Sequence, residues 1–258
     1  MSKKGKFTIL IFLTAISALG FSACRRAEID DAKNPAANSN EAQSAPMNPP
    51  PFAWNELSKR YENVKDYTAL YEKEEKAISK GERQTIKLSF RKPFDIRMDW
   101  LDDKGKIDQT AIYQKGKNDD KVAAKKGGML GSMAGTLKLA PDDPLALQDS
   151  KHPITEAGLG VLIDRITSVA NDPQTKTNYL GEEKTDAGRA AYKVEMSNPN
   201  GLNLTGVSNA RKAFVWIDKE LLLPVKVEIY DANGVLLERH VFSDLKLNAN
   251  LTDKTFEI

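Results

Sequence analysis

The sequence has few of the side chains that most catalytic and metal sites require. Its 258 residues include one cysteine, Cys24, and only two histidines, His152 and His240. One cysteine cannot form an internal disulfide or a redox pair. Two imidazoles exclude a histidine-rich metal site, although carboxylates remain potential ligands. The G-x-S-x-G motif of hydrolases and the G-x-x-x-x-G-K-[ST] phosphate loop are also absent. We therefore expect that the protein is not an enzyme and that it has no cofactor and no metal site.

Neither sign of charge dominates the sequence. Lysine and arginine number 38, aspartate and glutamate number 36, and the formal net charge is +2. A nearly neutral chain offers no electrostatic reason to bind nucleic acid, which proteins hold mainly through basic surfaces.

The N-terminus has the layout of a secretory signal peptide. A basic start, Met1–Lys6, precedes the apolar run Phe7–Leu19, which is too short to span a bilayer. The next residues end in F-S-A-C, which resembles a bacterial lipobox with Phe21 in place of the usual leucine. We predict that residues 1–23 are removed and that Cys24 is lipidated; the alternative is an ordinary signal peptide followed by an incidental cysteine. Removing the three lysines of the leader changes the net charge from +2 to −1.

A flexible tether is predicted to follow the lipidated cysteine. Residues 24–51 are rich in Ala, Asn, Ser and Pro and have no hydrophobic periodicity, so they cannot bury enough apolar surface to fold. As a coil the segment spans about 30 Å. Arg25, rather than aspartate, follows Cys24, which is compatible with sorting to the outer membrane. The prediction is a lipid-anchored, periplasm-facing protein with one folded domain over residues 52–258.

The stretch Thr85–Leu101 predicts the centre of an antiparallel sheet. Apolar and polar residues alternate through most of it, which places large side chains on one face. Lys92-Pro93 interrupts the alternation, and because proline cannot donate to a strand ladder we expect an edge position or a bulge there.

The remaining pattern predicts two helices and further short strands. Trp54–Val64 has helical spacing, and Thr155 is the expected N-cap of a second helix that ends at Asn171-Asp172-Pro173. The apolar residues expected to share one face of this second helix are Leu159, Leu162, Ile163, Ile166 and Val169. Short turns separate the other alternating runs, including the strong hairpin turn Asp231–Gly234. The total is about nine to eleven antiparallel strands with two or more helices, an α+β fold.

An apolar loop between Lys126 and Ala140 is a candidate lid. Glycine gives the backbone freedom, and Met129, Leu130 and Met133 can adapt to the shape of a ligand. The alternative is an ordinary surface loop whose apolar groups pack locally.

The aromatic and aliphatic residues of the sheet could line a cavity for a hydrophobic ligand. The candidates are Leu88, Phe90, Phe94, Ile96, Met98, Trp100, Tyr113, Tyr192, Phe214 and Trp216. The alternative is that the helices fill the space and these residues are simply core, because both arrangements require an apolar inner face.

One stretch contains the residue types of a hydrolase. Asp149, Ser150 and His152 lie close together in sequence, but adjacency does not create triad geometry. We expect a polar loop that positions the following helix, and keep a hydrolase using Ser150 and His152 as a minor alternative.

The order of these motifs resembles the LolA/LolB lipoprotein-carrier superfamily from about residue 54 to the C-terminus. The residues that carry the resemblance are Phe90–Pro93, Arg97, Trp100, Trp216–Asp218, Leu223, Pro224, Tyr230, Asp231, Gly234, Phe242, Asp244, Leu245, Leu247, Asn248 and Phe256. Within the superfamily, the stretch from His152 to Gly160 is similar to a bacterial lipoprotein family of unassigned function.

The resemblance implies a curved antiparallel sheet, an unclosed half-barrel whose concave face is plugged by helices. It further implies an interior that holds acyl chains of lipids or lipoproteins, and relatives that include a stress-sensing regulator. Soluble carriers have an arginine before the proline of the R-P element, where it helps to close the lid; Lys92 occupies that position here and lacks the planar guanidinium.

From these features we expect a non-enzymatic lipoprotein that binds lipid or lipoprotein acyl chains, is attached to the membrane through Cys24 and is monomeric. The alternative is an envelope scaffold or stress-sensing interaction module with a filled core.

Overall fold

The computed structural model describes residues 48–76, 83–128, 135–148 and 150–258. The predicted signal peptide, Cys24, most of the tether and the three lid candidates Met129, Leu130 and Met133 lie outside these residues. No helix within the described ranges has the length and apolar character needed to cross a membrane.

Eleven antiparallel strands of the described residues form one sheet, in the order β6-β5-β4-β3-β2-β1-β11-β10-β9-β8-β7. The strands are β1 (Asp66–Glu75), β2 (Gln84–Arg91), β3 (Asp95–Leu101), β4 (Ile107–Gln114), β5 (Val122–Lys126), β6 (Leu137–Leu139), β7 (Lys176–Lys184), β8 (Ala190–Ser197), β9 (Lys212–Asp218), β10 (Pro224–Tyr230) and β11 (Leu236–Leu247). The first and last strands, β1 and β11, pair with each other and join the two predicted meanders into one sheet. The strands at the two ends, β6 and β7, do not pair, so the sheet is not closed into a barrel.

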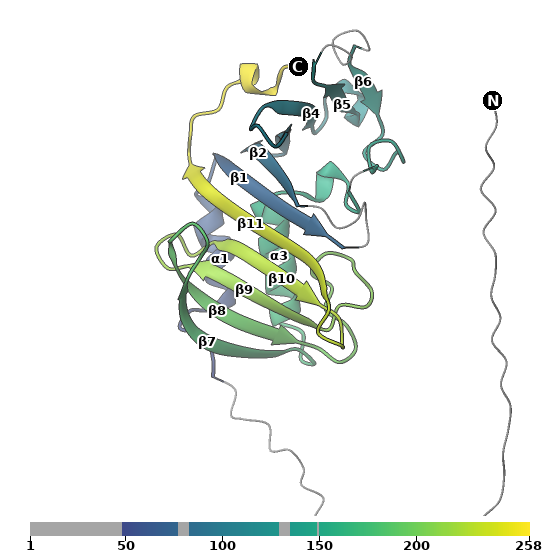
Figure 1. Cartoon of the computed structure of the whole chain (residues 1–258). Coiled ribbons are helices and arrows are strands. Elements are labelled where there is room, and N and C mark those ends of the chain that lie inside the picture. Colours follow the sequence, from purple (N-terminus) through teal and green to yellow (C-terminus); the bar gives the residue numbers. More distant parts are fainter. Residues whose placement is uncertain (1–47, 77–82, 129–134, 149) are drawn as a thin grey trace, which may run out of the picture. The chain divides into compact units, whose positions relative to one another are not determined.

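In the described part of the chain, the α-helices α1 (Trp54–Glu62) and α3 (Leu159–Ala170) cover the concave face of this sheet. Figure 1 shows the sheet bending around them, with β7–β10 on one side and β2–β6 on the other. The prediction of an unclosed, curved antiparallel sheet with helices on its concave face is therefore confirmed. Within the described residues, the 3-10 helices η2 (Asn118–Asp120) and η3 (Ile154–Glu156) lie in connections between strands and helices, and η4 (Asp253–Phe256) lies in the C-terminal tail after β11.

The start of α3 differs from the sequence prediction. Thr155 lies in η3, and the N-cap is Gly158, with φ of +105° and no side-chain cap. The main-chain N–H of Leu159 instead donates to the buried hydroxyl of Tyr67 on β1, at 2.8 Å. A β-carbon on residue 158 would lie 3.1 Å from that hydroxyl, so both the backbone angle and the close approach require glycine here. A long-range contact replaced the local cap that the sequence suggested.

The apolar face of α3 is as predicted. Its buried residues are Leu159, Leu162, Ile163, Ile166 and Val169. They pack onto the inward-facing side chains of the strands, including Tyr67, Leu88 and Ile96, in one large core. The burial of such fully enclosed side chains stabilises a fold by about 1.5–3 kcal/mol each.

The Lys92-Pro93 interruption is a turn between strands rather than a bulge or an edge. β2 ends at Arg91 and β3 begins at Asp95, and the two strands pair without a register shift. Lys92 Nζ donates to the carbonyl oxygens of Tyr61, at 2.7 Å, and Glu62, at 3.2 Å. A lysine at the C-terminal end of α1 supplies the positive charge that the helix dipole favours there.

Candidate functional site

A cavity of about 280 Å³ lies on the concave face, beyond the part that α1 and α3 fill. Its walls come from the inner faces of β1, β3–β6 and β11, from the start of α3 and from the connection between β6 and α3. Ligand pockets commonly measure about 300–1,000 Å³. The volume is therefore just below this range and suits one small or single-chain ligand.

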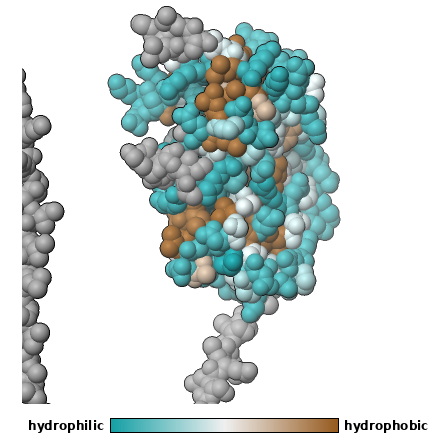
Figure 2. Space-filling model, turned by 90° about the vertical axis from the view of Figure 1, so that its right-hand side faces the viewer, coloured by the Kyte–Doolittle hydropathy of each residue, from teal (hydrophilic) through white to brown (hydrophobic). Residues whose placement is uncertain are grey.

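One wall of the cavity is apolar because the inner row of each strand continues the period-two pattern. Met98 on β3 pairs with Ala111 on β4, which in turn pairs with Ala124 on β5. The apolar lining residues of these strands are Met98, Trp100, Ala111, Val122, Ala124, Leu137 and Leu139. Figure 2 shows apolar patches interrupting an otherwise hydrophilic surface. Lining residues Leu137 and Leu145 are 46% and 52% exposed, so the apolar wall continues to the surface.

The opposite end of the cavity is polar, because β1 and β11, which pair with each other, both change from aromatic to charged side chains at paired positions. On β1 the inner row runs from Tyr71 to Lys73 and Glu75, and on β11 these residues pair with Phe242, His240 and Glu238. Apolar and aromatic residues thus give way to charged ones in both strands. All of these side chains are buried or nearly so. The cavity is therefore amphipathic, with an apolar wall and a buried polar end.

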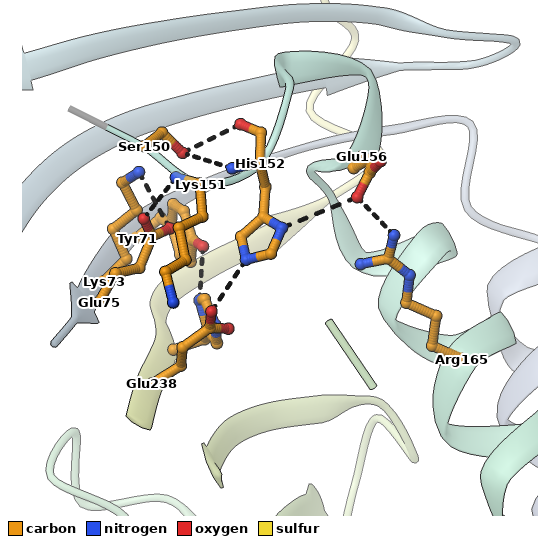
Figure 3. A network of polar contacts seen from close by, with 10 residues as sticks. Tyr71, Lys73, Glu75, Ser150, Lys151, His152, Glu156, Arg165 and Glu238 are labelled. Atoms are coloured by element: carbon orange, nitrogen blue, oxygen red, sulfur yellow. Dashed lines mark hydrogen bonds and ion pairs between the residues drawn. The ribbon is translucent and has the colours of Figure 1, made fainter. Parts of the chain in front are cut away.

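Both histidines of the chain contact the same carboxylate, that of Glu238, whose side chain is 0% exposed. His152 Nε2 lies 3.0 Å from Glu238 Oε1 (Figure 3). His240 Nε2 lies 3.2 Å from Glu238 Oε2. Burial by itself would raise the pKa of Glu238, but the hydrogen bonds and charges of the two imidazoles outweigh it and hold the pKa well below its ordinary value. The carboxylate is therefore ionised. His240 Nδ1 lies 2.8 Å from the hydroxyl of Tyr71, whose pKa is raised by burial and by nearby Glu75 and Glu238.

The segment Ser150–Glu156 attaches the connection before α3 to this polar end. The main-chain N–H of Lys151 donates to Glu75 Oε2, at 2.9 Å. His152 Nδ1 lies 3.8 Å from Glu156 Oε2, which accepts a 2.6 Å bond from Arg165 on α3 (Figure 3). Lys73 completes the cluster through its ion pair with Glu75, at 3.3 Å. We call Tyr71, Lys73, Glu75, His152, Glu156, Arg165, Glu238 and His240 the polar cluster.

Ser150 and His152 do not have the arrangement of a nucleophile and its base. Ser150 Oγ donates to the main-chain oxygen of His152 and accepts from its main-chain N–H, whereas the imidazole is directed to Glu238. These contacts fix the main chain of Ser150–His152 in a tight local conformation ahead of α3. Within the described ranges, no three or more histidine, cysteine, aspartate or glutamate side chains are placed to hold a metal ion.

The structure brings two of the ten candidate cavity residues, Met98 and Trp100, to the cavity wall. Trp100 Nε1 donates to Gln84 Oε1 at 3.0 Å, which fixes the ring orientation.

Six other candidates face the same side of the sheet but belong to the core or pack against it: Leu88, Phe90, Phe94, Ile96, Tyr113 and Tyr192. Phe90 stacks on Tyr67 with ring centroids 5.3 Å apart, and Tyr192 packs against Phe52 at 5.7 Å. These rings fill space next to the helices.

Phe214 and Trp216 lie on the other face of the sheet, away from the cavity. Their strand neighbours Val215 and Ile217 point into the core instead. Lys193 and Lys226 lie over the Trp216 ring, with Nζ 4.9 Å and 4.3 Å from its centroid. Long lysine side chains can cover an aromatic ring while keeping their charge in water, which explains a buried tryptophan on the outer face.

The chain belongs to a family described as "Protein of unknown function (DUF1571)". The family model matches residues 64–258. No curated protein matches the sequence.

Several solved structures are similar to the chain at low identity. The MucA/MucB complex of Pseudomonas aeruginosa matches with 18% identity and a TM-score of 0.46, over 80% of this chain and 59% of that one. The Mycobacterium tuberculosis lipoprotein LppX matches with 13% identity and a TM-score of 0.46, over 77% and 94% of the two chains. A LolA superfamily protein from Nitrosomonas europaea matches with 11% identity and a TM-score of 0.29, over 80% and 98%. This chain thus spans about three fifths of the MucB chain. None of these similarities assigns a ligand or a partner to it.

Proposed function

We propose that this protein is a non-enzymatic binding protein of the bacterial cell envelope that holds a hydrophobic ligand in the concave-face cavity. The observation that carries the proposal is the cavity itself: its wall from β3–β6 is apolar, and its volume is about 280 Å³. An acyl chain in contact with this wall leaves water, which stabilises the complex by about 0.8 kcal/mol per buried methylene. The N-terminal sequence supports the envelope location, with Cys24 lipidated and anchoring the protein to the outer membrane.

The size of the cavity favours a single acyl chain over the several chains of a lipidated protein. The candidate lid, Met129, Leu130 and Met133, belongs to the connection that follows β5, and β5 itself lines the cavity. In the proposal this connection adapts to the ligand that occupies the cavity. The alternative function is an interaction module without ligand, which the large core under α1 and α3 would also support.

Two adjacent alanines of β5 offer a matched test. Ala124 lines the cavity, whereas Ala123 pairs with Ile112 and Lys138 in the opposite orientation and is not part of the wall. Ala124→Phe adds a ring to the cavity, and Ala123→Phe adds the same ring to the outer face of the same strand.

Native mass spectrometry of the full chain carrying Cys24→Ala, which has no lipid of its own, measures the outcome. After exposure to a bacterial lipid extract we expect bound lipid on the parent and on Ala123→Phe, and little or none on Ala124→Phe. A chain that stays free of lipid, or equal lipid on both phenylalanine variants, would contradict the proposal and favour the interaction module.

A further inference from the structure

The wall of the cavity carries more positive than negative charge. The charged residues among the described ones that line it are the cations Lys73, Lys125, Lys126 and Arg165 and the carboxylates Glu75 and Glu156. Protonation of His152 or His240 would only add positive charge. Glu238 is not a lining residue, and counting it would still leave more cations than carboxylates. The sign of the excess therefore does not depend on the ionisation of the imidazoles.

The positive excess lies on β5, away from the polar cluster. In the polar cluster Lys73 pairs with Glu75, at 3.3 Å, and Arg165 pairs with Glu156, at 2.6 Å (Figure 3). The side chains of Lys125 and Lys126 have no ion-pair or hydrogen-bond partner among the residues that the structure describes. β5 is four strands away from β1 in the sheet, so the carboxylates of the polar cluster do not pair with these two lysines.

Lys126 belongs to the inner row of β5. Side chains alternate along a strand, so Lys126 shares the face of Ala124, and both residues line the cavity. In the sheet Lys126 pairs with Gln109 of β4, another lining residue, whose side chain makes no hydrogen bond within the described ranges. Two residues away on these strands, Ala124 and Ala111 belong to the apolar wall. A cation and an amide thus border the apolar wall on neighbouring strands.

On the basis of the function proposed above, we infer that the ligand is a single-chain amphiphile with an anionic head group, of the kind a fatty acid carries, and that the head group lies at Lys126, beside Gln109. The ammonium and amide N–H groups donate, and a carboxylate accepts. Lys126 is exposed, so a carboxylate beside it keeps part of its hydration and avoids the large cost of burying a charge. The acyl chain then lies on the apolar wall.

A competing location for an anionic head group is Arg165, which keeps N–H donors beyond its bond to Glu156. Its side chain is only 27% exposed, and the carboxylate of Glu156 is next to it. An anion there would lose more hydration and would meet a like charge, both of which disfavour binding. The rim at Lys126 has neither disadvantage, and the experiment separates the two locations.

Three amphiphiles with the same chain and different head-group charges test the inference: dodecanoate, glycerol monododecanoate and dodecylamine. Their affinities for the Cys24→Ala chain are measured by isothermal titration at pH 7.5 and low salt, below their critical micelle concentrations. The neutral ester is the reference, because it contacts the apolar wall without a charged head group. Each result is the affinity of a charged amphiphile divided by that of the ester, so effects on the apolar wall cancel.

Two matched substitutions locate the head group. Lys126→Gln removes a positive charge from the rim, and we expect the dodecanoate-to-ester ratio to fall about fivefold, which corresponds to about 1 kcal/mol. The dodecylamine-to-ester ratio should rise, because a repelling cation is gone. Lys138→Gln is the control: Lys138 of β6 is exposed, pairs with the outward-facing Ala123 and does not line the cavity. It should change each ratio by less than about twofold.

Salt gives a second readout. Interactions between exposed charges are screened by salt, since the Debye length falls from about 10 Å at 0.1 M to about 3 Å at 1 M. Raising the NaCl concentration should therefore lower the dodecanoate-to-ester ratio in the parent and in Lys138→Gln, and should lower it less in Lys126→Gln. Circular dichroism establishes that the variants are folded.

Each other result has a distinct meaning. A dodecanoate-to-ester ratio that falls less than about twofold in Lys126→Gln, or equally in Lys138→Gln, would overturn the inference. A loss of dodecanoate binding on Arg165→Gln with none on Lys126→Gln would place the head group at the polar cluster and overturn it as well. Failure of all three amphiphiles to bind would contradict the proposed function itself, whereas binding without the expected response to Lys126→Gln contradicts only the anionic head group at this rim.

Discussion

The replacement of Glu238 by alanine should destabilise the fold more than any surface substitution. The side chain is fully buried and is the shared acceptor of two imidazoles, one from β11 and one from the segment before α3. Removing one partner of a buried, hydrogen-bonded ionic group costs about 3–5 kcal/mol, because the remaining polar groups stay buried without their partner. The loss should also free the segment Ser150–Glu156 from β11.

Urea unfolding at pH 7, followed by circular dichroism, measures the free energy of unfolding for this variant. For a domain of this size, 3–5 kcal/mol corresponds to a fall in Tm of roughly 6–20 °C. Glu195→Ala is the control, because a partly exposed surface pair such as Glu195–Lys212 contributes only about 0–1 kcal/mol. A loss below about 1 kcal/mol in Glu238→Ala would refute the reasoning.

The same carboxylate makes a prediction about pH. The pKa of Glu238 in the folded protein lies below its ordinary value of 4.5, so its stabilising contribution is present above that value. The contribution is lost as the pH falls through the lowered pKa. The difference in unfolding free energy between the parent and Glu238→Gln should therefore persist at about pH 5 and shrink in stronger acid. If the difference in unfolding free energy between the parent and Glu238→Gln grew below pH 4, the predicted direction of the pH dependence would be wrong.

Three further substitutions test the packing and the anchor. Gly160→Ala should destabilise the protein by about 1–3 kcal/mol in urea unfolding, because the new methyl group would lie 2.7 Å from the Tyr61 ring; an unchanged midpoint would contradict the close packing of α1 on α3. Lys92→Met should cost about 1–3 kcal/mol, because it removes two charge-assisted hydrogen bonds to the end of α1, and Lys87→Met, at an exposed position on the preceding strand β2, is the control. Cys24→Ala should move the protein from the membrane fraction to the soluble fraction of cells, and a protein that stays with the membranes would contradict lipidation at this residue.

The sequence predicted the helices and strands of the fold better than the contacts between them. Alternation in Thr85–Leu101 and the apolar face of α3 depend on local spacing, and both are present in the structure. The N-cap of α3 was missed because the group that replaces it, the Tyr67 hydroxyl, is 92 residues away in sequence. The alternation of side chains along a strand likewise put Phe214 and Trp216 on the same face of the sheet. It did not show which face of the sheet is concave. Because lysine side chains cover the Trp216 ring, a tryptophan can lie on the outer face. The residue type therefore did not show on which face Trp216 lies.

The polar cluster was beyond the reach of local patterns for a similar reason. Lys73 and His240 meet only because β1 pairs with β11, which brings together the two ends of the domain. One signal was present in the sequence: on an alternating strand, Glu238 and His240 must share the face of Phe242. A charged pair continuing an apolar row is unusual and marks the place where a buried polar site begins. Only the pairing of the strands showed what lies opposite.

The dependence of affinity on chain length tests most directly whether the cavity holds an acyl chain. Glycerol monoesters of increasing chain length, titrated into the Cys24→Ala chain, should bind about fourfold more tightly with each added methylene, the equivalent of 0.8 kcal/mol. The affinity should then stop rising once the chain outgrows the cavity of about 280 Å³. Affinities that do not change with chain length, or that rise without limit, would contradict the account.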